Sequence, residues 1–281
     1  MGKSRLYRTE GIVLRRRDQG EADRVLTLCT PIGKLDAIAK GVRKVRSRKA
    51  GHIELFSRSS FVIASVPASW DIISQVETIQ PHAVLRSDLL RGTYARYVIE
   101  LLDRFLTEGE GGQATFELLD RALTWLCEDE DLDLIIRRYE MRILDLAGFR
   151  PELFYCVGNH ENRVALRVTS VPQTSPNQPR YGFDLERGGA LCPVCYETAS
   201  RQGAAGMTGD ALRFLQESQK TPYSILRERA VPRSIHQVIE PILRRYICYH
   251  LESGINSLTF LNRLRQEMEP AVNQSAYQVS R

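Results

Sequence analysis

The sequence of 281 residues contains no run of about 18 consecutive apolar residues, the length a helix needs to cross a membrane. Its basic N-terminal stretch is not followed by the apolar core of a secretion signal, so we expect a cytoplasmic protein. The sequence also lacks the glycine-rich loops that hold nucleotides and the HExxH pattern of zinc proteases. Its five histidines are dispersed along the chain. No motif indicates catalysis, and we expect a protein that is not an enzyme.

Positive charge is unevenly distributed along the chain. Residues 1–80 contain fifteen Lys and Arg against eight Asp and Glu, whereas the rest of the chain contains twenty-four against twenty-six. The formal net charge of +5 therefore originates in the first 80 residues. A basic segment joined to a nearly neutral remainder indicates a module that binds a polyanion.

The first 80 residues have the alternation of apolar and polar residues that is typical of strands. Short strands are predicted at 11–14, 24–29, 34–39, 61–64 and 71–76, separated by Gly, Pro and Ser. Five strands in about 75 residues are typical of a small barrel such as the OB-fold, which often carries sites for single-stranded nucleic acid. A small antiparallel sandwich fits the same spacing.

From about Pro81 the apolar period changes to 3.6 residues, which indicates helices. The predicted helices cover 85–105, 116–126, 134–146, 208–218, 234–252 and 256–266. A segment rich in Pro and Gly at about 150–206 interrupts them as an extended insertion. We therefore predict an α+β protein: an OB-fold-like β-barrel domain at 1–80, then a mainly helical domain at 81–281 that carries a zinc-finger-like insertion.

A strongly basic run lies between the third and fourth predicted strands. Residues 40–49 contain six cations, and no acidic residue occurs between Asp36 and Glu54. Such a patch gives salt-dependent binding of nucleic acid without sequence preference, because each neutralised phosphate releases counterions. A solvated loop with no partner is the alternative. The candidate DNA-binding residues are Arg15, Arg16, Arg17, Arg24, Lys34, Lys40, Arg43, Lys44, Arg46, Arg48 and Lys49.

The basic run contains no aromatic residue on which a base would stack. Tyr7, Phe56, Phe61 and Trp70 lie elsewhere and fit equally well in the core. We infer that the run grips the phosphate backbone and leaves base edges free, an arrangement suited to strand annealing.

Three of the six cysteines lie in the Pro- and Gly-rich segment. Cys192 and Cys195 form the CxxC half of a zinc ribbon, whereas Asn159 stands where a second cysteine would follow Cys156. His160 is the next residue and is a suitable fourth ligand. We therefore predict a structural Zn²⁺ site at Cys156, His160, Cys192 and Cys195. The alternatives are a site that has lost its metal and a redox-active thiol pair.

Several segments resemble the RecO family. The resemblance rests on AKGVRK at 39–44 followed by ELF at 54–56, and on GIVL at 11–14 followed by EADR at 21–24. It continues with LAGFRP at 146–151 and GGALCPVC at 188–195, so the matching motifs span nearly the whole chain in order.

The resemblance implies an N-terminal OB-fold, a helical domain with a zinc-finger insert, and binding of single- and double-stranded DNA. It also implies annealing of complementary strands without ATP, and loading of RecA, together with RecR, onto DNA coated by single-strand DNA-binding protein. That protein's acidic C-terminal tail is a further implied partner. A groove among the helices is a candidate receptor for the tail, edged by Arg137, Arg138, Arg142, Arg244 and Arg245. The alternative function is a zinc-ribbon-containing RNA-binding or transcription-regulatory protein.

Overall fold

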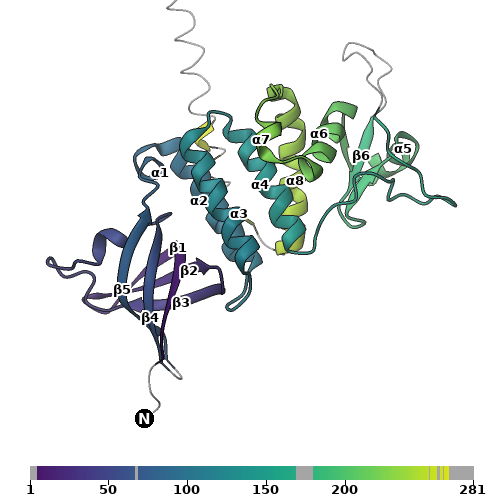
Figure 1. Cartoon of the computed structure of the whole chain (residues 1–281). Helices are drawn as coiled ribbons and strands as arrows, with labels where there is room; N and C mark the ends of the chain where they lie inside the picture. The colour runs from purple at the N-terminus through teal and green to yellow at the C-terminus, as the bar shows by residue number, and fades with distance from the viewer. Residues whose placement is uncertain are drawn as a thin grey trace, which may run out of the picture. The chain divides into compact units, whose positions relative to one another are not determined.

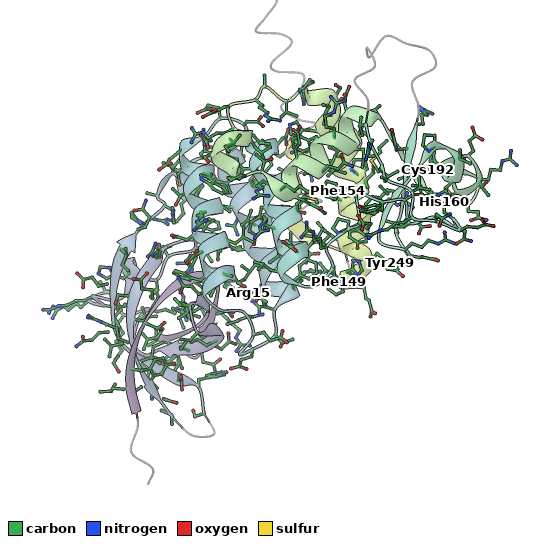
Figure 2. The ribbon with its side chains drawn as sticks, turned by 45° about the vertical axis from the view of Figure 1, so that its right-hand side comes forward. Arg15, Phe149, Phe154, His160, Cys192 and Tyr249 are labelled. Atoms are coloured by element: carbon green, nitrogen blue, oxygen red, sulfur yellow. The ribbon has the colours of Figure 1, made fainter. Side chains whose placement is uncertain are left out.

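The structure is a computed structural model that describes residues 5–66, 69–168, 180–252, 254–257, 260–261 and 263–265. Figure 1 traces the chain, and Figure 2 adds the side chains. The chain divides into two compact units, residues 1–132 with 255–281, and residues 133–254. Within the described ranges, no helix is both long and apolar enough to cross a membrane.

The first unit begins with a closed five-stranded barrel in the order β1-β2-β3-β5-β4 (Figure 1). β3 and β5 pair in parallel, whereas the other neighbouring strands pair antiparallel. The predicted OB-like barrel is thereby confirmed in place of a sandwich. The strands are β1 (Arg5–Gln19), β2 (Asp23–Thr30), β3 (Gly33–Ala39), β4 (Arg58–Ser65) and β5 (Asp71–Gln80), with a short 3₁₀ helix, η1 (Ala50–His52), before β4.

β1 is much longer than the strand predicted at 11–14 because it serves two neighbours in turn. Its first half pairs with β4 and its second half with β2. The pairing register shifts between Val13 and Arg15, which marks a bulge where the strand bends from one partner to the other. A strand that bends in this way closes the barrel and leaves the arginines after the bulge on the hairpin that β1 forms with β2.

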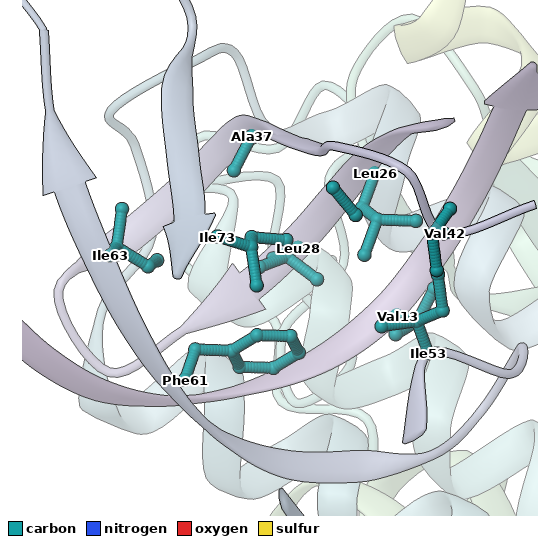
Figure 3. Packing of buried hydrophobic residues seen from close by; sticks show 10 residues of the cluster. Val13, Leu26, Leu28, Ala37, Val42, Ile53, Phe61, Ile63 and Ile73 are labelled. Carbon is teal, nitrogen blue, oxygen red and sulfur yellow. The ribbon is translucent and has the colours of Figure 1, made fainter. Parts of the chain in front are cut away.

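The barrel core consists of the inward-facing residues of the alternating strands. Leu26, Leu28, Phe61 and Ile63 are fully buried and pack together in the barrel (Figure 3). Val42, from the loop after β3, joins this cluster and is only 2% exposed. The basic loop is therefore anchored to the barrel by an apolar side chain.

The first unit also contains α1 (Val84–Ser87), α2 (Leu89–Phe105) and α3 (Gln113–Glu128), with further helical residues at 256–257, 260–261 and 263–265. The single helix predicted at 85–105 is wrong, because the chain breaks at Asp88. This residue is extended, and its carboxylate caps α2 by accepting a hydrogen bond from the backbone N–H of Arg91. Leu89 belongs to the predicted apolar stripe, yet it is 63% exposed.

The second unit is mainly helical, as predicted. It contains α4 (Leu132–Leu146), α6 (Gly209–Lys220), α7 (Tyr223–Leu226) and α8 (Arg233–Leu251). The predicted zinc-finger-like insertion lies between α4 and α6, where the chain forms a small antiparallel sheet in the order β7-β6-β8 with one helix. These elements are β6 (Tyr181–Asp184), β7 (Gly189–Leu191), α5 (Pro193–Ser200) and β8 (Ala205–Met207). The helix predicted at 256–266 belongs to the first unit; its described residues, 256–257, 260–261 and 263–265, are helical, and the others lie outside the described residues.

Candidate metal centre and nucleic-acid interface

The predicted metal ligands form one cluster in the second unit. One ligand atom from each of Cys156, His160, Cys192 and Cys195 lies within 4.8 Å of the others. Nε2 of His160 is 3.6 Å from Sγ of Cys192 and 3.2 Å from Sγ of Cys195. Figure 2 shows His160 and Cys192 together in the insertion. Tetrahedral zinc, with bonds of about 2.3 Å to sulfur and about 2.0 Å to nitrogen, separates such atoms by about 3.5 Å. The donor set therefore fits a tetrahedral metal ion.

Local backbone structure explains why the ligands converge. Cys192 is the N-cap of α5, so Cys195 falls in the first turn of that helix. Sγ of Cys156 accepts hydrogen bonds from the backbone N–H of Gly158 at 3.3 Å and of Cys192 at 3.1 Å. Such N–H donors orient a sulfur ligand. A Cβ atom on Gly158 would lie 2.4 Å from Sγ of Cys195, so a side chain at this position would displace that thiol.

Without a cation, the surroundings of Cys195 disfavour its thiolate form. Burial, together with Cys156 and Cys192, raises the pKa of Cys195 to about 12. A divalent cation reverses this effect, because it binds the thiolate and releases the proton. Four protein ligands fill a tetrahedron and leave no position for a substrate, so the cluster is suited to a structural metal.

The second predicted site is the set of cations on the barrel. Several are already paired: Arg16 with Glu54 at 2.7 Å, and Arg24 with Asp18 at 2.8 Å. Arg43 lies 3.4 Å from Asp18, and Arg15 lies 3.0 Å from Asp103. Among the described residues, four exposed cations of the basic loop have no ion pair. They are Lys40, Lys44, Arg46 and Arg48.

Backbone contacts hold the loop 40–49 against the β1–β2 hairpin. The backbone N–H of Gly41 donates to Oδ1 of Asp23 at 2.7 Å, and that of Arg43 donates to the carbonyl of Ala22 at 2.9 Å. At the other end of the loop, Nζ of Lys49 donates to the carbonyl of Ile73 in β5 at 3.0 Å. The unpaired cations are therefore presented on an anchored loop.

Lys34 has a different environment from the other candidates. Its side chain is 12% exposed, and its ammonium lies 2.6 Å from the carboxylate of Asp103. It also donates to the carbonyls of Asp103 and Leu106, at the C-terminal end of α2. These contacts attach β3 to α2, because an ammonium is favoured where helix carbonyls have no backbone partner. A contact of Lys34 with DNA stays a prediction.

The arginines predicted to edge a groove in the helical unit differ in exposure. Arg137 is only 1% exposed and lies 3.0 Å from the equally buried Glu140, so it does not edge a surface groove. Arg138 donates to the carbonyl of Ser218, and burial lowers its pKa to about 10. Arg142 forms an ion pair with Asp145 at 2.7 Å.

Sequence reasoning gave no role to Trp70, which lies one residue before β5. Phe56 and Phe61 are buried, whereas Trp70 is 38% exposed. The guanidinium of Arg17 lies over its ring, 5.5 Å from the centroid. Trp70 lies just outside the predicted strand, where the alternation of apolar and polar residues no longer indicates which side chains face the core. The sequence therefore did not distinguish this exposed indole from a buried one.

Comparison with known proteins shows two family models that together match most of the chain. The model described as "Recombination protein O N terminal" matches residues 3–82, and "Recombination protein O C terminal" matches residues 86–259. Similar proteins include the "DNA repair protein RecO" of Roseiflexus sp., 35% identical over 94% of this chain and 88% of the relative. The protein of that name from Pelotomaculum thermopropionicum is 33% identical over 93% of this chain and 96% of the relative. With its barrel, its helical unit and its Cys/His cluster, the chain belongs to the RecO family of DNA repair proteins.

Proposed function

We propose that this protein is a non-catalytic mediator of DNA repair and recombination that binds single- and double-stranded DNA and anneals complementary strands without ATP. The observation that carries the proposal is the anchored basic loop. Lys40, Lys44, Arg46 and Arg48 are exposed without ion pairs, while Val42 fixes the loop to the barrel core. Cations held in this way meet phosphates without first having to break an internal ion pair.

Phosphate neutralisation accounts for both parts of the proposed activity. Contacts to the backbone carry no sequence information, so they serve any single strand or duplex. Two complementary strands repel each other as polyanions, and a protein that neutralises phosphates on both lowers this repulsion while the bases pair. Such a process needs no nucleotide hydrolysis, which agrees with the absence of nucleotide-binding loops from the sequence.

The remaining parts of the proposal concern the domains, the metal and the partners. The domain 1–80 carries the DNA site, and the helical domain 81–281 carries the insertion at about 150–206. Zn²⁺ bound by Cys156, His160, Cys192 and Cys195 would supply a structural link between the start of the insertion and α5. The family relationship supports a role for RecR, for the tail of single-strand DNA-binding protein, and indirectly for RecA. It also supports action at the nucleoid in the cytoplasm.

The test is annealing of two complementary fluorescent oligonucleotides by the purified protein, without ATP, over a series of salt concentrations. We expect faster annealing that weakens as salt rises. A parallel titration with RNA of the same sequence distinguishes the alternative function. Tight RNA binding without acceleration of DNA annealing would refute the mediator proposal in favour of an RNA-binding role.

A further inference from the structure

Trp70 is an exposed aromatic residue in a barrel whose basic loop has none. It is 38% exposed, whereas Phe56 is 2% exposed and Phe61 is fully buried. Tyr7 is partly buried, and its hydroxyl donates to Oδ2 of Asp71 at 2.8 Å. Of the four aromatic residues 7, 56, 61 and 70, only Trp70 is exposed to solvent.

The backbone behind this indole is held firmly. Asp71 follows Trp70 directly, begins β5 and pairs with Ala37 of β3. Its carboxylate accepts one hydrogen bond from Tyr7 and another from the backbone N–H of Val66 at 3.3 Å. A side chain attached next to such a fixed point loses little conformational freedom when a ligand packs on it. Trp70 is therefore suited to serve as a flat, positioned platform.

A chain of contacts joins this platform to the proposed DNA site. The guanidinium of Arg17 lies 5.5 Å from the centroid of the Trp70 ring. Arg17 precedes the β1–β2 turn, to which the backbone of Gly41 and Arg43 is hydrogen-bonded. Lys49, at the far end of the loop, is bonded to Ile73, three residues after Trp70. The indole, Arg17 and the basic loop are therefore linked by contacts between neighbouring elements of the barrel.

We propose that Trp70, backed by Arg17, is a base-stacking subsite for single-stranded DNA. This inference rests on the proposed function and deepens it, because the basic loop alone would contact only phosphates. Every base has a π-face, so stacking on an indole does not depend on sequence. Bases of a duplex already stack on each other, so this subsite favours single strands over duplex, whereas the loop cations serve both.

Intrinsic fluorescence reports on this stacking directly, because the chain has only two tryptophans. In Trp125→Phe, Trp70 is the sole indole. We expect a normal single-stranded oligonucleotide to quench its emission, and an abasic strand of equal length and charge to leave the emission nearly unchanged. In the reciprocal variant Trp70→Phe, emission from Trp125 in α3 should not respond to either strand.

Binding affinity provides the second measurement. Trp70→Ala should weaken binding of the normal single strand by about tenfold, and should leave binding of the abasic strand unchanged. The matched control is Tyr249→Ala, which removes a 49% exposed aromatic ring from the other unit and should leave both affinities unchanged. Thermal unfolding of each variant establishes that the fold is intact.

The outcomes separate this inference from the proposed function. Equal quenching by normal and abasic strands, or equal affinity of Trp70→Ala and the unaltered protein for the normal strand, would refute stacking and leave DNA binding intact. Failure of the unaltered protein to bind either strand would refute the proposed function itself.

Discussion

Removal of the four unpaired loop cations should flatten the salt dependence of DNA binding by a predictable amount. The change is Lys40→Ala, Lys44→Ala, Arg46→Ala and Arg48→Ala in one variant. Each phosphate neutralised on a single strand contributes about −0.7 to the slope of log affinity against log salt, so four contribute about −2.8. Between about 50 and 200 mM salt, the unaltered protein should therefore lose about 50-fold more affinity than the variant loses.

Fluorescence anisotropy with a labelled single strand measures both slopes. The matched control substitutes Gln for four arginines that already form ion pairs with Asp or Glu. These are Arg121, Arg142, Arg213 and Arg229. Both variants remove four positive charges from a formal net charge of +5, so long-range attraction falls equally. The control should keep a slope close to that of the unaltered protein. Equal slopes in the two four-site variants would show that net charge, not the loop, governs binding.

Three further predictions concern stability and the metal site. Gly158→Ala should weaken metal binding by about tenfold or more, because the added Cβ would lie 2.4 Å from Sγ of Cys195. Competition with a chromophoric chelator measures the affinity. An unchanged affinity would contradict the close approach of these two positions. Lys34→Met should destabilise the fold by about 2 kcal/mol in urea unfolding, because it removes the ammonium from Asp103 and from two carbonyls at the end of α2, while Asp103 keeps its ion pair with Arg15. Lys40→Met should have little effect. Burial lowers the pKa of His82 despite its hydrogen bond to the carbonyl of Phe56, so the folded state resists protonation. Its contribution to stability is full above the unfolded pKa of about 6.5 and is lost as pH falls below it. The melting temperature should therefore decline less between about pH 7.5 and 5.5 in His82→Asn, and an unchanged decline would exclude His82 as the cause.

The barrel was predictable from sequence because its signals are local. Alternation with a period of two marks each strand, and the inward-facing residues Leu26, Leu28 and Ile63 follow it directly. The break at Asp88 was not predicted, because the apolar spacing runs on through it. An acidic residue in a helical pattern is equally consistent with a cap and with an exposed position, and only the surrounding structure decides between them. The sheet of the insertion was not predicted, because its strands have only three or four residues, too few to show an alternation of apolar and polar residues.

The candidate sites divide in the same way. The CxxC spacing of Cys192 and Cys195 specifies a knuckle by itself, and His160 was a plausible completion because imidazole and thiolate bind the same metals. The ion pairs of the cations could not be predicted from the sequence, because the partners are distant along the chain. Lys34, for example, forms an ion pair with Asp103, which lies 69 residues later. A count of positive charges therefore overstated the number available to phosphates, and tertiary contacts decided which ones remain exposed. The exposure of Trp70 depends on tertiary contacts in the same way.

Metal removal should act on the second unit and spare the DNA site of the barrel. All four ligands belong to residues 133–254, whereas the basic loop and Trp70 belong to the first unit. A site whose dissociation constant is one hundredth of the free zinc concentration stabilises the folded state by about 2.7 kcal/mol. Chelation should therefore lower the thermal stability of the second unit while the salt slope of DNA binding stays unchanged.

His160→Ala should reproduce the effect of the chelator, and elemental analysis should show loss of bound metal. Asn159→Ala is the matched control, because this exposed neighbour is outside the ligand cluster and should keep the metal. Equal metal loss in both variants would show that the loop, not the imidazole, secures the ion. A flattened salt slope after chelation would show that the insertion contacts DNA. In that case the basic loop would not account for the salt dependence by itself. The proposed DNA-binding region would then comprise residues 1–80 together with the insertion that holds the metal site.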